Sequence, residues 1–117
     1  MEASLDARDL AGVLVFARSG RLEVRGSDTD RVVVRGEICA SHEDLVDMAE
    51  LSVDRYRDRA RIEVRLPDTR WREYARLDLV VEMPARLGVE IDDTSGELVV
   101  GDVASARIED NSGEIRV

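Results

Sequence analysis

Apolar and polar residues alternate in three similar stretches of the chain. Residues 11–24, 87–100 and 104–117 each show apolar-x-apolar, a polar run, Ser-Gly and then apolar-x-Val. Because successive side chains of a strand point to opposite sides, each stretch predicts two half-buried strands joined at a Ser-Gly corner. The residues predicted to share the buried face are Val13, Val15, Leu22 and Val24 in the first stretch, Val89, Ile91, Leu98 and Val100 in the second, and Ala106, Ile108, Ile115 and Val117 in the third.

The glycines of the three Ser-Gly pairs are predicted to be structural corner residues. These are Gly20, Gly96 and Gly113. A chain that turns sharply between strands often needs a positive φ, which costs a residue with a Cβ about 1 kcal/mol or more. The serine before each glycine can bond to nearby backbone groups.

The spacing of the repeats favours one of two topologies. A hairpin meander would join antiparallel strands, whereas in a solenoid each copy would stack in phase on the next, about 4.8 Å away. The last two copies lie seventeen residues apart without a gap in phase, which favours the solenoid. The predicted fold is therefore mainly β, a short parallel β-helix-like solenoid with one short helix, and the alternative is an antiparallel β-sandwich. Residues 1–117 are predicted to form a single β-repeat domain.

The remaining periodic segments predict further strands and one helix. Strands are expected at 21–26, 31–36, 61–65 and 76–84, the last ending at Pro84. Residues 41–51, "SHEDLVDMAEL", predict a helix of two to three turns, because Ser41 can cap it and acidic residues occupy its first turn. The intervening "LPDTRWREY" is expected to be a loop.

The composition indicates which residue types fill the core and argues against one class of partner. Hydrophobic residues make up 44% of the chain but aromatic residues only 3%, so Val, Leu, Ile and Ala must fill the core. The formal net charge of -9 argues against a nucleic-acid partner, which needs clustered positive charge. Cys39 is the single cysteine, so the chain has no intramolecular disulfide and a buried structural thiol is expected.

No arrangement of residues in the sequence predicts a catalytic centre or a cofactor. The single histidine is His42, and the sequence supplies no cysteine, serine or second histidine in a pattern that would complete a triad or a zinc site with it. The chain is therefore predicted not to be an enzyme. The remote alternative is a glycan-acting β-helix enzyme, for which Asp92, Asp93, Glu109 and Arg107 would have to meet in one cleft.

Acidic residues at equivalent positions are the weak candidates for a metal site. In-phase stacking would place Glu97 over Glu114, Asp93 over Asp110 and Asp92 over Glu109. Like charges on adjacent strands repel each other, and a divalent cation such as calcium would relieve that repulsion. The spacing matches no calcium-loop consensus, so a solvated acidic edge is favoured over a metal site.

The order of these motifs resembles a known family. The succession of "SGRLEVRG", the acidic helix, "ARIEVRLP", "LDLVVEMPARLGVEIDDTSGELVVGDV" and "ARIEDNSGEIRV" is similar to the putative-adhesin family of bacterial and archaeal β-strand-repeat domains of unknown function. The resemblance implies stacked parallel coils and no established catalytic residues. Members commonly carry more Ser-Gly coils after the proline, so the resemblance also implies a short member or one that lacks C-terminal coils.

The predicted function is a non-catalytic β-solenoid scaffold, an adhesin-like or protein-interaction module of unknown ligand, and the alternative is an intracellular regulatory or scaffold domain. The last coil, with Ile115 and Val117, is predicted to pair with another copy or with further residues of a longer chain, because an open coil exposes strand edges. The first residues lack a secretory signal and "VLVF" is too short to span a membrane. A cytoplasmic location is expected for the chain as written, whereas the resemblance implies the cell surface.

Overall fold

The computed structural model describes residues 1–18, 20–93, 96–110 and 115–116. Strands dominate this part of the chain, which confirms the prediction of a mainly β protein. The elements in chain order are β1 (Glu2–Asp6), β2 (Gly12–Ala17), β3 (Leu22–Ser27), β4 (Arg31–Ala40), α1 (Glu43–Met48), β5 (Glu50–Tyr56), β6 (Arg59–Arg65), β7 (Ala75–Pro84), β8 (Gly88–Asp93), β9 (Leu98–Gly101), β10 (Ser105–Asp110) and β11 (Ile115–Arg116).

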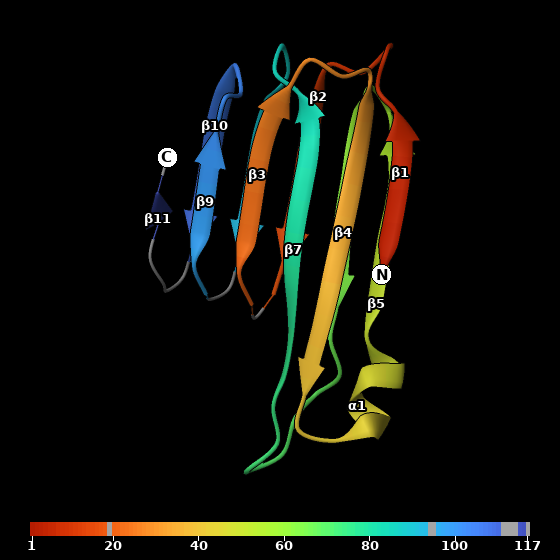
Figure 1. Cartoon of the computed structure of the whole chain (residues 1–117), viewed down its shortest axis with the longest axis vertical. Coiled ribbons are helices and arrows are strands. Elements are labelled where there is room, and N and C mark those ends of the chain that lie inside the picture. Colours follow the sequence, from red (N-terminus) through yellow and green to blue (C-terminus); the bar gives the residue numbers. More distant parts are fainter. Residues whose placement is uncertain (19, 94–95, 111–114, 117) are drawn as a thin grey trace.

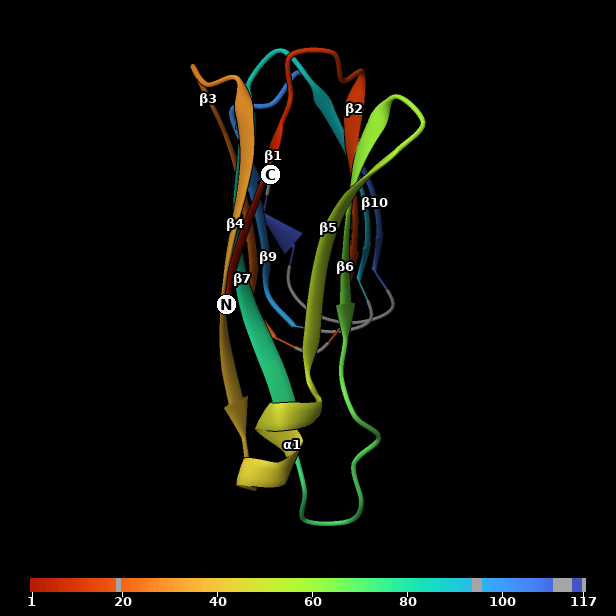
Figure 2. The ribbon, with the colours of Figure 1, turned by 90° about the vertical axis from the view of Figure 1, so that its right-hand side faces the viewer.

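The strands form two sheets that face each other (Figure 1). One sheet has the order β1-β4-β7-β3-β9-β11, and the other has the order β10-β8-β2-β6-β5. Figure 2 looks along the layers and shows the sheets side by side, with helix α1 near one end of both. Buried aliphatic side chains from both sheets make up the core cluster between them.

The three sequence repeats lie beside one another in parallel and in phase. In one sheet Val13 of β2 pairs with Val89 of β8, which pairs in turn with Ala106 of β10. In the other sheet, the backbone of Leu98 lies between Leu22 and Ile115. The prediction of parallel pairing among the repeats is therefore confirmed.

The same stacking extends to two strands that the repeat pattern did not include. Strand β6 runs parallel to β2, with Ala60 beside Val13. Strand β7 runs parallel to β3, with Leu79 beside Leu22. A unit of β6 and β7 thus lies next to the unit of β2 and β3, although the long loop 66–74 joins its two strands.

Antiparallel strands close the opposite end of both sheets. Strand β4 is antiparallel to both β7 and β1, and β5 is antiparallel to β6. Strands β1 and β5 were not predicted, and they lie in contact with each other across the two sheets (Figure 2). The sheets therefore meet at this end.

Two of the three predicted corner glycines have the backbone conformation that a corner requires. Gly20 has φ 127° and Gly96 has φ 108°. A Cβ on Gly96 would run into the carbonyl oxygen of Gly20, and a Cβ on Gly20 would run into the carbonyl oxygen of Leu77. The corners therefore stack so closely that backbone fills the space of a side chain. Gly113 lies outside the described residues.

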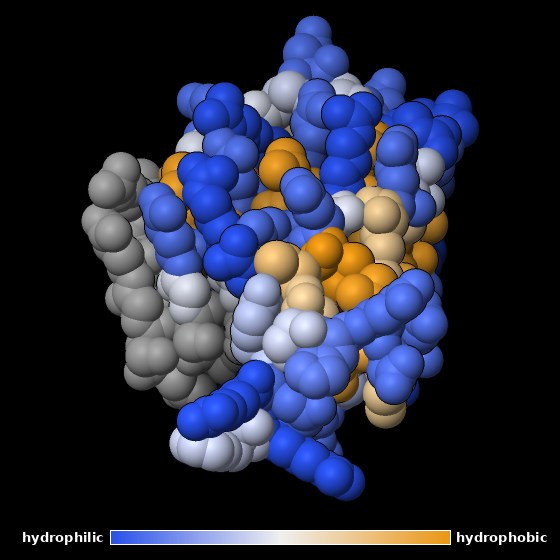
Figure 3. Space-filling model, turned by 60° about the horizontal axis from the view of Figure 1, so that its bottom comes forward, coloured by the Kyte–Doolittle hydropathy of each residue, from blue (hydrophilic) through white to orange (hydrophobic). Residues whose placement is uncertain are grey.

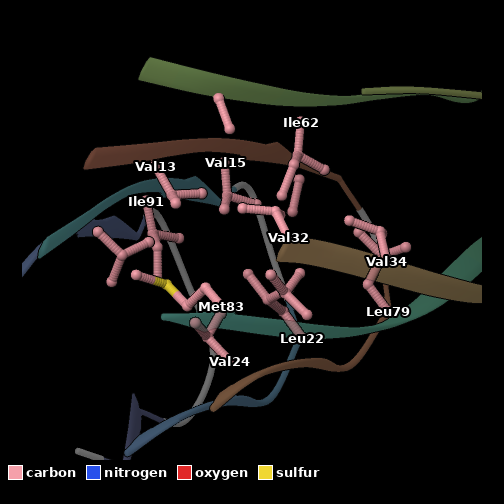
Figure 4. Close-up of a cluster of buried hydrophobic side chains, with 14 of the residues drawn as sticks. Val13, Val15, Leu22, Val24, Val32, Val34, Ile62, Leu79, Met83 and Ile91 are labelled. Atoms are coloured by element: carbon pink, nitrogen blue, oxygen red, sulfur yellow. The ribbon is translucent and has the colours of Figure 1, made fainter. Parts of the chain in front are cut away.

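The core consists of columns of aliphatic side chains, one from each stacked strand (Figure 4). Ile62, Val15 and Ile91 form one column, with exposed fractions of 0%, 1% and 3%. In the facing sheet Leu79, Leu22 and Leu98 form another column, and each is no more than 2% exposed. The prediction that aliphatic residues fill a thin interior agrees with this packing.

The helix is shorter than predicted and starts two residues later. Its N-cap is His42 and not the predicted Ser41, and the side chain of His42 forms no cap bond. The Oγ of Ser41 instead accepts a hydrogen bond from the backbone N of Tyr74 at 2.9 Å. Leu45 is its buried residue. Cys39 is half-buried rather than buried, and its Sγ lies 3.9 Å from the Oη of Tyr74.

Asp6, the last residue of β1, has a carboxyl group whose pKa depends on one arginine. Arg8 Nη2 donates to Asp6 Oδ2 at 2.7 Å, and the backbone N of Arg8 donates to Asp6 Oδ1 at 3.0 Å. These bonds lower the pKa of Asp6 from 3.8 to about 2. A carboxyl with a lowered pKa stabilises the fold above its unfolded pKa, and this contribution disappears as the pH falls from 3.8 to about 2.

We expect Arg8→Gln to return the pKa of Asp6 towards 3.8, because the guanidinium hydrogen bond is the largest cause of the shift. Titration of the side-chain carboxyl carbon by NMR measures it. Arg31→Gln is the matched control, since Arg31 contributes the smallest effect on Asp6 and its replacement should move the pKa less. An Asp6 that titrates near 3.8 in the unsubstituted protein would contradict this expectation.

Candidate binding face

The outer face of the five-stranded sheet carries exposed apolar side chains in a strip. Val13 and Val15 of β2 point into the core, so Leu14 and Phe16 point away from it. Phe16 is 40% exposed, and Tyr56 at the end of β5 is 45% exposed. Leu14, Phe16 and Tyr56 line one shallow groove together and are called the apolar strip below.

Charged residues lie within the apolar strip and along one side of it. Arg59, Arg61 and Glu63 belong to β6, the strand between Leu14 and Phe16 of β2 and Tyr56 of β5. Those on the far side of β2 are Glu90 and Asp92 of β8 and Arg107 and Glu109 of β10.

One ion pair crosses the strand that carries the strip. Arg59 Nη1 lies 3.1 Å from Glu90 Oε2, although β2 separates their strands. Gly12 is the residue of β2 beside Arg59, and because it has no side chain the arginine can reach across. Both partners are exposed by more than 40%, so the pair orders the surface more than it stabilises the fold.

Tyr56 is held by arginine at the other end of the strip. The guanidinium carbon of Arg61 lies 5.2 Å from the centre of the Tyr56 ring, and Arg61 Nη2 donates to Asp54 Oδ2 at 3.0 Å. The hydrogen bond to Asp54 raises the pKa of Arg61. A cation over the face of an aromatic ring is attracted to it, so this contact restricts the orientation of the exposed ring.

Two open grooves flank the side chain of Phe16. The groove towards β6 and β5 has a volume of about 340 Å³. The groove towards β10 has a volume of about 310 Å³, and its lining includes Asp92, Arg107 and Glu109. Sites for small ligands usually enclose most of the ligand, whereas these shallow grooves suit side chains that project from a larger partner.

The adjacent acids Asp92 and Asp93 lie on opposite sides of strand β8. Asp92 pairs with Glu109 and Asp93 with Asp110, as the stacking predicted. Asp92 is exposed, but its neighbour Asp93 points inward and is 0% exposed. The second groove therefore contains Asp92, Glu109 and Arg107 but not Asp93, so the cleft of four residues named for a glycan-acting enzyme does not form.

Glu97 lies at the Ser-Gly corner before β9, where its Oε2 is 3.6 Å from Arg21 Nε. Glu114 lies outside the described residues. Among residues 1–18, 20–93, 96–110 and 115–116, no group of three His, Cys, Asp or Glu is arranged to hold a metal ion. Of the two residues predicted to mediate self-association, Ile115 pairs through its backbone with Leu98, and Val117 is outside the described residues.

Sequence reasoning did not find the apolar strip. The alternation in "VLVF" contains the signal for Phe16, because two inward valines place the residues between and after them on the outer face. Tyr56 had no comparable signal, since β5 was not predicted as a strand. Its position follows from antiparallel pairing with β6, in which Tyr56 lies opposite Arg59.

Other surfaces of the molecule are distinct in character. The outer face of the six-stranded sheet carries bonded polar pairs, such as Arg25 with Glu23 at 2.6 Å and Ser27 with Glu82 at 2.8 Å. Figure 3 views the end with α1 and shows an apolar area surrounded by hydrophilic residues. Met48 in α1 and Trp71 in the loop 66–74 are 60% and 84% exposed. Within the described ranges, no helix has the length and apolar character needed to cross a membrane.

Comparison with known proteins finds a distant likeness in structure. The chain is similar to a putative cell adhesion protein from Clostridium sporogenes ATCC 15579, with a TM-score of 0.58 and 11% sequence identity. The superposition covers 97% of this chain and 58% of that protein, so this chain spans less than two thirds of its length. At this identity the likeness shows a shared fold. No protein-family model and no curated protein matches the sequence.

Proposed function

We propose that the chain is a non-catalytic, adhesion-type module that binds a protein partner through the apolar strip. Its scaffold is a short parallel β-helix-like solenoid, in which stacked two-strand units hold Leu14, Phe16 and the charged residues beside them at fixed spacing. The observation that carries the proposal is the exposure of Phe16 and Tyr56, at 40% and 45%, on a face built from ordered strands.

The chemistry of this face fits a protein partner. Aromatic and arginine side chains are enriched in protein interfaces, and the energy of binding concentrates in a few such residues surrounded by a polar rim. Phe16 and Tyr56 would supply the apolar anchors, with the arginines of β6 between them, and the charged rows on β8 and β10 would supply the rim on the side of Phe16. Open grooves beside Phe16 can admit side chains of the partner.

Two resemblances support the adhesion-type class. The order of the sequence motifs is similar to the putative-adhesin family, and the shared fold links the chain to a protein described as a putative cell adhesion protein. Neither resemblance identifies the partner, so the class of partner rests on the surface of this chain.

Selection from a phage-displayed library of random linear peptides tests the proposed face. We expect the unsubstituted protein to enrich clones whose binding falls by about tenfold or more with the double variant F16T/Y56T. Threonine suits strand positions, and both replaced side chains are exposed, so the fold is expected to persist.

The matched control is M48T/W71T, which removes two exposed apolar side chains from the other end of the molecule. The same clones should bind this variant as they bind the unsubstituted protein. Clones that bind F16T/Y56T equally well, or a selection that enriches no clone, would contradict the proposed face.

A further inference from the structure

Strand β10 forms an open edge of the five-stranded sheet. Within the described part of the chain its sheet neighbour is β8, on one side alone. The opposite edge strand, β5, lies against β1 of the other sheet. The two edges therefore differ, and β10 presents backbone donors and acceptors that can pair with another strand.

The core is also less well covered at β10 than elsewhere. Ile108 occupies the same column as Ile62, Val15 and Ile91, which are 0%, 1% and 3% exposed. Ile108 is only half-buried, and Ala106, in the column of Val13 and Val89, is exposed. A further strand beside β10 would cover both side chains, which favours an occupant with apolar residues at alternate positions.

The charges on β10 indicate which strand fits. Arg107 and Glu109 flank Ile108, and both are exposed on the outer face. When two copies of β10 pair antiparallel about a two-fold axis at Ile108, Arg107 of each copy lies opposite Glu109 of the other. Side chains directly opposite each other in an antiparallel pair have Cβ atoms about 4.5–5.5 Å apart, so opposite charges there attract.

Neighbouring registers do not have this complementarity. An axis at residue 107 places Arg107 opposite its own copy, and an axis at residue 109 places Glu109 opposite its own copy. Like charges directly opposite are destabilising. The charges thus select the register that also brings the two Ile108 side chains together over the open core.

We propose that the chain forms a two-fold dimer in which β10 pairs antiparallel with β10 of a second copy, centred on Ile108. The two five-stranded sheets then become one continuous sheet, and both apolar strips lie on the same outer side. Such an interface is isologous, since each copy contributes the same residues to it. It does not depend on the protein partner proposed for the apolar strip.

Sedimentation velocity over a concentration series, up to millimolar protein, tests the dimer. We expect the unsubstituted protein to shift from monomer to dimer as the concentration rises. R107E and E109R each replace two opposite-charge pairs by two like-charge pairs, so each should raise the dimer dissociation constant on the order of tenfold or more. D68R and R76E make the same changes in net charge at exposed positions away from β10, and should leave the constant unchanged.

Two rescue experiments identify the register. The double variant R107E/E109R restores both opposite-charge pairs and should dimerise within about threefold of the unsubstituted protein. An equimolar mixture of R107E and E109R should form heterodimers, because the two variants carry complementary charges at 107 and 109. Circular dichroism confirms that each variant is folded.

A protein that stays monomeric at millimolar concentration would overturn the proposal, as would single variants without effect or a double variant that does not recover. F16T/Y56T should still dimerise, so a dimer that persists when peptide binding is lost separates the two proposals.

Discussion

Replacing Gly20 by alanine is expected to lower the free energy of unfolding by roughly 2–5 kcal/mol. Gly20 has φ 127°, which an L-residue rarely adopts, and the added Cβ would meet the carbonyl oxygen of Leu77 in the neighbouring stacked unit. The backbone of the corner would have to move to relieve this contact. Chemical denaturation of the variant beside the unsubstituted protein measures the change.

Gly101→Ala is the matched control, because a Cβ at Gly101 has no heavy atom within 4 Å. It should change the free energy of unfolding by less than about 1 kcal/mol, in the stabilising direction, since glycine weakens a strand. If Gly20→Ala and Gly101→Ala had equal effects, the corners would not be stacked as closely as the structure shows.

Leu22→Ala is expected to cost about 2–5 kcal/mol of unfolding free energy. Leu22 is 1% exposed and lies between Leu79 and Leu98, so its truncation leaves a cavity in the middle of a column. Thermal or denaturant unfolding measures the loss. Val80→Ala is the control, because Val80 is 42% exposed on the outer face of the same sheet and should cost about 0.5 kcal/mol or less.

The column also predicts which pairs of substitutions interact. Leu22→Ala and Leu98→Ala remove neighbouring side chains, so their effects should depart from additivity by about 0.5 kcal/mol or more. Leu22→Ala and Leu45→Ala should add, because Leu45 lies in α1 outside the core cluster. Additive effects of the first pair would show that Leu22 and Leu98 do not share a cavity.

The alternation of residues predicted those parts of the fold that repeat. Val13, Val89 and Ala106 occupy equivalent positions in the three copies, and they are neighbours in one sheet. Gly20 and Gly96 have the positive φ expected of corners. Period and corner chemistry are local properties of the sequence, so they could be read without knowledge of contacts.

The antiparallel end of the molecule could not be predicted in the same way. Strand β1 has an acidic sequence with one large aliphatic residue, Leu5, and gains its pairing from β4, which is distant in the chain. Strand β5 overlaps the segment predicted as helix, and its alternating Leu51 and Val53 become recognisable only opposite β6. Long-range pairing, rather than local propensity, determines these strands.

The candidate site could likewise be predicted only where it follows from the repeat and not where it follows from long-range strand pairing. The pairing of Asp92 with Glu109 followed from the repeat, but the apolar strip needs Tyr56, which antiparallel pairing brings to the face of β6. The burial of Asp93 beside an exposed Asp92 follows from the two-residue period of a strand, which assigns adjacent acids to opposite sides. The two adjacent acids Asp92 and Asp93 therefore face different surroundings, although the repeat pattern treats them alike.

Nuclear Overhauser effects between backbone protons of β8 and β10 test the stacked arrangement most directly. Parallel, in-phase pairing predicts contacts between residues seventeen apart, namely 89 with 106 and 91 with 108, in the same order along both strands. Contacts in the reverse order, with 89 near 110 and 93 near 106, or no contacts between the two segments, would contradict the stacking on which the binding face and the open edge both depend.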